Sequence, residues 1–123
     1  MEKEFIPYEQ ALALKELGFD IPCIKYYWTD GTVNRTYEIP IDHNKKDIVI
    51  SAPLYQQAFR WFREKYDLRS WIESNHGILK FEYVIATTNS NFIDKQFDDF
   101  SSFKTYEEAE LECLKKLIEI TRK

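Results

Sequence analysis

The sequence has 123 residues, of which 44% are hydrophobic and 16% aromatic, with only three glycines and four prolines. This length favours a single domain over residues 1–123, and such a composition excludes a disordered or loop-rich chain. The formal charge of −4 argues against a basic nucleic-acid binder, and no apolar run reaches the roughly 18 residues of a membrane span.

Residues 7–17 are predicted to form the first helix. Pro7 suits the first helical position, where its missing N–H costs no bond, and Gly18 can adopt the left-handed conformation that ends a helix. Residues 23–29 and 32–39 then predict two strands. The dipeptide Asp30-Gly31 between them predicts a type I′ hairpin turn, which needs positive φ at both positions.

The alternation of residues along the first strand predicts two faces. We expect the face that turns toward the helices to carry Ile24, Tyr26 and Trp28. Tyr27 then belongs to the opposite face of the sheet. A further short strand is predicted at residues 47–50.

Residues 51–68 predict a central amphipathic helix. Ser51 is the expected N-cap, and Pro53 suits the first turn. Aromatic residues dominate the apolar face, which is expected to dominate the core: Tyr55, Phe59, Trp61, Phe62 and Tyr66.

The rest of the chain repeats the pattern of a hairpin and a helix. Residues 69–73 and 78–87 predict strands joined by a turn at 74–77, and residues 92–100 either form a final edge strand or a loop. Thr105 and Glu108 form a capping-box signal for a last helix at 105–122. The predicted fold is α+β, in the order α-β-β-α-β-β-α, with one antiparallel sheet of four to five strands and three helices packed on one face.

Few residues suggest chemistry. His43 and His76 lie in polar turns, where we expect them to be solvent-exposed. Cys23 and Cys113 are expected to be buried free thiols in a reducing compartment, because their spacing matches no zinc motif. We therefore predict no catalytic residue, no metal site and no cofactor.

Two charges, Lys65 and Glu110, fall on the apolar faces of their predicted helices. One interpretation is that Lys65 extends to water from the last helical turn and that Glu110 lies at the rim of the core. The other is a buried charge pair, because a buried charge needs a partner.

Tyr27 and Trp28, with Tyr37 on the return strand, are the candidate protein-binding surface. Tyrosine and tryptophan are favoured at interfaces because they combine a large apolar area with a hydrogen-bonding group. The alternative is ordinary cross-strand pairing of aromatic side chains within the sheet.

Three segments read FIPYEQALALKELGFD, APLYQQAFRWFREKY and KTYEEAELECLKKLIEI, at residues 5–20, 52–66 and 104–120. Together they resemble a family of short proteins encoded by bacteriophages and Bacteroidetes genomes. That family has no established activity, so the resemblance implies an accessory role in a phage or mobile element and no catalytic residues.

The sequence thus favours a non-enzymatic protein-binding accessory module in the cytoplasm, with no nucleic-acid or membrane partner. A self-associating structural protein is the first alternative, as a homodimer joined through the free sheet face or an edge strand. A small enzyme of unknown reaction is the second.

Overall fold

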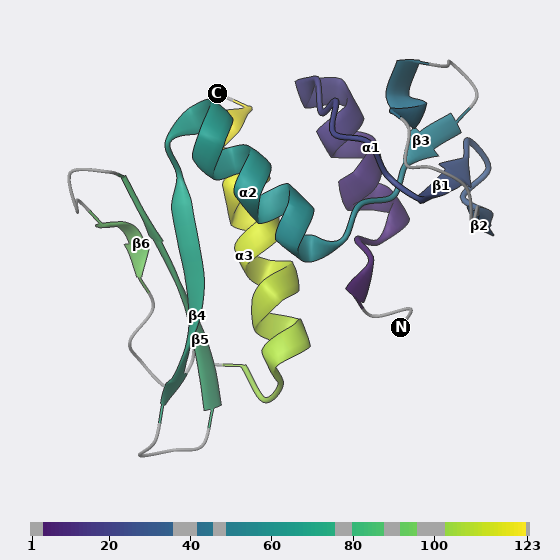
Figure 1. Ribbon diagram of the computed structural model, residues 1–123. Coiled ribbons are helices and arrows are strands. Elements are labelled where there is room, and N and C mark those ends of the chain that lie inside the picture. The colour runs from purple at the N-terminus through teal and green to yellow at the C-terminus, as the bar shows by residue number, and fades with distance from the viewer. Residues whose placement is uncertain are drawn as a thin grey trace. The chain divides into compact units, whose positions relative to one another are not determined.

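The computed structural model describes residues 4–35, 42–45, 49–75, 80–87, 92–95 and 103–122. Its class is α+β, and helices and antiparallel hairpins follow each other in the predicted order (Figure 1). In chain order the elements are α1 (Tyr8–Leu17), β1 (Lys25–Trp28), β2 (Val33–Arg35), a 3₁₀ turn (His43–Lys45), β3 (Val49–Ser51), α2 (Tyr55–Tyr66), β4 (Arg69–Asn75), β5 (Lys80–Ala86), β6 (Phe92–Lys95) and α3 (Tyr106–Thr121).

The described strands form two antiparallel sheets, in the orders β2-β1-β3 and β4-β5-β6. The predicted single sheet of four to five strands is therefore not found, because β3 pairs with β1 and the later strands pair among themselves. The chain divides into two compact units, Met1–Ala58 with Arg122 and Phe59–Thr121 with Lys123. The single domain stays a prediction.

In the first unit, α1 ends as the sequence predicts. Gly18 has a φ of 95°, and its N–H donates to the Lys15 carbonyl at 3.0 Å. The N–H of Phe19 donates to the Leu14 carbonyl at 2.9 Å, which closes the helix end. The Lys15 ammonium reaches the Val49 carbonyl at 2.8 Å and ties α1 to β3.

The turn between β1 and β2 differs from the predicted type I′ turn. Of the two residues that the type I′ turn would place at positive φ, Gly31 has a φ of 89°, whereas the φ of Asp30 is not positive. The Gly31 N–H donates to the Trp28 carbonyl, and the Trp28 N–H donates to the Thr32 carbonyl. This pattern fits a type I turn followed by a glycine bulge. The Asp30 carboxylate stabilises it by accepting the Thr32 N–H at 2.9 Å.

Helix α2 begins at Tyr55, four residues after the predicted N-cap. Ser51 is the last residue of β3 and pairs with Tyr26 of β1, so the strand continues where a helix was expected. The Gln57 side chain instead accepts the Leu54 N–H at 2.9 Å, in the manner of the third residue of a capping box. At the other end, Asp67 takes a positive φ of 58°.

In the second unit, α3 lies against β4 and β5. Ring contacts join Phe81 to Tyr106 and Tyr83 to Phe103, with centroids 6.0 and 6.2 Å apart. The predicted start of α3 is confirmed, because Thr105 Oγ1 accepts the Glu108 N–H at 3.1 Å. The buried face of this helix consists of Ala109, Cys113, Leu114, Leu117 and Ile118.

Candidate functional site

Strand β1 presents its faces opposite to the prediction. Tyr27 and Lys25 are buried, whereas Tyr26 is half-buried and Trp28 is 36% exposed. Ile24, just before the strand, is 41% exposed. The candidate binding surface predicted from the sequence therefore keeps Trp28, loses Tyr27 and gains Tyr26. Tyr37 lies outside the described residues.

Contacts with the chain before β1 explain why Tyr27 turns inward. Its hydroxyl donates to the Ile6 carbonyl at 2.7 Å, and its ring meets Tyr8 edge-on at 5.6 Å. The buried Lys25 ammonium lies 4.2 Å from the centroid of the Phe5 ring, an attractive cation–π contact. Either face of β1 carries residues that can be buried. The contacts with the chain before β1 therefore decide which face turns inward.

Three rings in successive contact, two on the other face of β1 and one on the 3₁₀ turn, form what we call the aromatic array: Trp28, Tyr26 and His43. The Trp28 and Tyr26 centroids are 5.6 Å apart, and the Tyr26 and His43 centroids are 4.6 Å apart. Exposure falls along the array, from 36% at Trp28 to 3% at His43. The array thus joins a solvent-exposed tryptophan to a fixed buried end.

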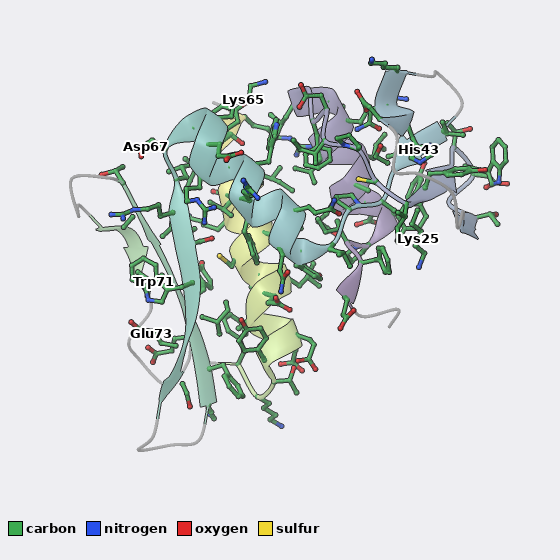
Figure 2. All side chains as sticks on the ribbon, in the orientation of Figure 1. Lys25, His43, Lys65, Asp67, Trp71 and Glu73 are labelled. Atoms are coloured by element: carbon green, nitrogen blue, oxygen red, sulfur yellow. The ribbon has the colours of Figure 1, made fainter. Side chains whose placement is uncertain are left out.

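Two hydrogen bonds hold His43, which Figure 2 shows on the 3₁₀ turn. Its Nε2 lies 2.9 Å from the Cys23 carbonyl oxygen, and since a carbonyl only accepts, Nε2–H is the donor. Its backbone N–H donates to Ser51 Oγ at 3.0 Å. The expectation that His43 is solvent-exposed is wrong, because Cys23, just before β1, and Ser51, at the end of β3, supply acceptors that hold it in a buried position.

Asn44 completes the attachment of this turn to the first unit. Its Oδ1 accepts the Ser51 N–H at 2.8 Å, and its Nδ2 donates to the Phe19 carbonyl at 3.0 Å. The side chain therefore links the end of α1 to β3. Single-sequence reasoning missed these roles of Asn44 and His43 because the residues they bind are 7 to 25 positions away.

Cys23 lies beside this network and is protonated at neutral pH. Burial raises the pKa of its thiol to about 12, despite a hydrogen bond with the Ser51 side chain that lowers it. Its Sγ donates to the Ile21 carbonyl at 3.3 Å. A thiol must lose its proton to act as a nucleophile. We therefore assign a structural role to the contacts that join Cys23, His43 and Ser51. Cys23 and Cys113 are both free and buried, as predicted.

The raised pKa of Cys23 predicts a loss of stability at alkaline pH. In the unfolded chain the thiol ionises near its ordinary pKa of about 9, whereas in the folded chain it holds its proton to about pH 12. The contribution of the buried, protonated thiol to the free energy of unfolding is therefore complete below pH 9. It declines as the pH rises toward 12, by about 1.4 kcal/mol per pH unit. Urea unfolding at pH 8, 9 and 10 should show a steeper alkaline decline in the wild type than in Cys23→Ala. Equal slopes would contradict the prediction.

In the second unit, Lys65 is exposed, and its ammonium lies 5.1 Å from the Trp61 ring centroid (Figure 2). This exposure agrees with the first interpretation, in which Lys65 extends to water from the last turn of α2. Glu110 is half-buried on α3. Burial, followed by the charges of Glu110 and Cys113, raises the pKa of Tyr106. A Lys65–Glu110 pair stays a prediction.

Trp71 on β4 is a second exposed tryptophan, at 41%, which the sequence analysis did not select. Its indole Nε1 donates to Glu73 Oε1 at 3.0 Å, on the side of β4 away from α3 (Figure 2). Strand alternation could have identified this face from the sequence, since it places Arg69, Trp71 and Glu73 on the same side of β4. His76 lies outside the described residues.

No family model matches the sequence, and neither a curated protein nor a solved structure is similar to it. Within the described ranges, no helix is long and apolar enough to cross a membrane. In the same part of the chain, no group of three or more His, Cys, Asp or Glu side chains is placed to hold a metal ion.

Proposed function

We propose that this chain is a non-enzymatic protein-binding module that contacts its partner through Trp28 and Ile24. The single observation that carries the proposal is the aromatic array, which presents an exposed indole on a buried, hydrogen-bonded support. Trp28 and Ile24 are among the few large hydrophobic side chains that the described residues expose. Tryptophan is also the side chain most enriched among residues that dominate binding energy.

The support beneath Trp28 favours binding because it reduces the entropy lost on association. A free surface tryptophan loses rotamer freedom when a partner immobilises it, which costs about 0.5–1.5 kcal/mol. Tyr26 already contacts Trp28 edge-on, and Tyr26 in turn packs on the ring of His43. A side chain held in its bound position before the encounter avoids part of that cost.

The chemistry at the base of the array supports a structural role over catalysis. His43 uses Nε2–H to bind a backbone carbonyl, and the Cys23 thiol is protonated at neutral pH. The resemblance to short phage and Bacteroidetes proteins makes a bacterial or phage protein the proposed partner, within an accessory role.

The proposal is tested by comparing three forms of the protein as bait: wild type, Trp28→Ala, and, as a control, Tyr106→Ala, which removes another exposed aromatic side chain. Each is immobilised and exposed to a bacterial lysate, and bound proteins are identified by mass spectrometry. We expect a partner that wild type and Tyr106→Ala retain equally and that Trp28→Ala binds roughly 30-fold more weakly, as loss of a dominant contact implies. Circular dichroism must show that all three are folded. Partners held equally by all three forms would contradict the proposal.

A further inference from the structure

Strand β4 forms one edge of the second sheet in the part of the chain that the structure describes. It pairs with β5 over all seven of its residues, from Arg69↔Ala86 to Asn75↔Lys80. Among the described residues, no strand pairs with its other side. The outer edge of such a strand is a template for pairing with another strand.

The backbone bonds of β5 identify the residues of β4 that face outward. Phe81 exchanges two 2.8 Å backbone bonds with Phe103, so its N–H and C=O point away from β4. In an antiparallel ladder, bonding direction alternates from one residue to the next. Ser74, which lies opposite Phe81, therefore points its backbone groups to the outer edge. By the same alternation, Ile72 and Ser70 do so as well.

We propose that the outer edge of β4 pairs with β4 of a second copy of this chain, antiparallel and about a two-fold axis at Ile72. In this register Ile72 meets Ile72 of the partner, and Ser70 meets Ser74. Every outward N–H and C=O of these three residues then has a partner. The two three-stranded sheets become one continuous six-stranded sheet.

The side chains of β4 are self-complementary in this register. Trp71 of each copy lies opposite Glu73 of the other, so the indole–carboxylate contact already present within the strand at 3.0 Å can also form between copies. Arg69 lies diagonally across from the opposite Glu73, within reach of a long side chain. A register shifted by one pair toward the C-terminus would instead place the two Glu73 carboxylates face to face, which is unfavourable.

Apart from the charges of Arg69 and Glu73, which the proposed register brings near each other, the sequence of this edge lacks the usual features that prevent pairing. Edge strands are usually protected by lysine, by proline or by being very short. Strand β4 has seven residues, RSWIESN, and includes neither lysine nor proline. The edge strands of the first sheet, β2 and β3, have three residues each within the described ranges.

The test is the mass in solution of wild type, Ser74→Pro and Ser74→Ala, measured by size-exclusion chromatography with light scattering over a range of concentrations. Proline at 74 removes an outward N–H and leaves the bonds to β5 intact, so the monomer should stay folded. Ser74→Ala removes the same hydroxyl but keeps the N–H. We expect wild type and Ser74→Ala at twice the 14.8 kDa of the chain, and dimerisation roughly 30-fold weaker in Ser74→Pro, because each copy loses one bond.

A second variant separates this dimer from the proposed partner surface. Trp28→Ala should keep the dimer mass, and Ser74→Pro should keep the partner that depends on Trp28. A wild-type monomer at all concentrations would overturn the proposal. A dimer unaffected by Ser74→Pro, or one lost in Trp28→Ala, would also overturn it, because the interface would then lie elsewhere.

Discussion

Replacing Phe62 by alanine is expected to lower the free energy of unfolding by about 3–5 kcal/mol. Phe62 is fully buried, at 0% exposure, in the half of α2 that belongs to the second unit. Its ring contacts those of Trp61 and Tyr66, with centroids 5.1 and 6.0 Å away. Removal of the ring leaves a cavity that rigid neighbours fill only in part, so the lost packing adds to the lost burial.

Urea unfolding followed by circular dichroism measures this effect. The adjacent Arg63 is exposed on the same helix, so Arg63→Ala is the matched control and should change stability by less than about 0.5 kcal/mol. Equal losses in the two variants would show that the ring-rich side of α2 does not form core, and would contradict the burial on which the fold depends.

Replacing His43 by alanine is expected to cost about 2–4 kcal/mol, the second largest effect. The change leaves the Cys23 carbonyl without its donor and removes a ring that is 97% buried against Tyr26. An unsatisfied buried acceptor costs about 1–3 kcal/mol, and the cavity adds to that cost. Without the imidazole, Tyr26 and Trp28 also lose their support.

Two measurements on His43→Ala separate these consequences. Urea unfolding should show the loss of stability, whereas Lys45→Ala, an exposed change in the same turn, should show almost none. At a temperature where His43→Ala is still folded, capture of the partner that requires Trp28 should weaken as well. Unchanged stability would mean that His43 does not anchor the turn, and unchanged capture would mean that Trp28 needs no such anchor.

The proposed dimer and the proposed partner surface lie in different units of the chain. Pairing through β4 uses only backbone groups and the face that carries Trp71 and Glu73, whereas partner binding uses Trp28 on the first sheet. Two copies joined at β4 would present two Trp28 surfaces, which would increase the avidity for a partner with repeated sites.

Local sequence signals located most of the elements correctly. Gly18 ends α1 and Thr105 begins α3 because each acts on backbone groups within a few residues of itself. The predicted start of α2 was wrong because Ser51 is a good N-cap and also an acceptable strand residue. Its pairing with Tyr26, 25 positions earlier, made it part of β3.

Composition and periodicity by themselves determined the α+β class, the order of helices and hairpins, and the two buried thiols, since these depend on local propensity and on the average cost of exposing apolar groups. Only the tertiary structure decided that the strands form two sheets, that Tyr27 turns inward and Trp28 outward, and that His43 is buried. In each case either choice was locally acceptable, and the deciding contact came from a residue distant in sequence: the Ile6 carbonyl for Tyr27, and the Cys23 carbonyl for His43.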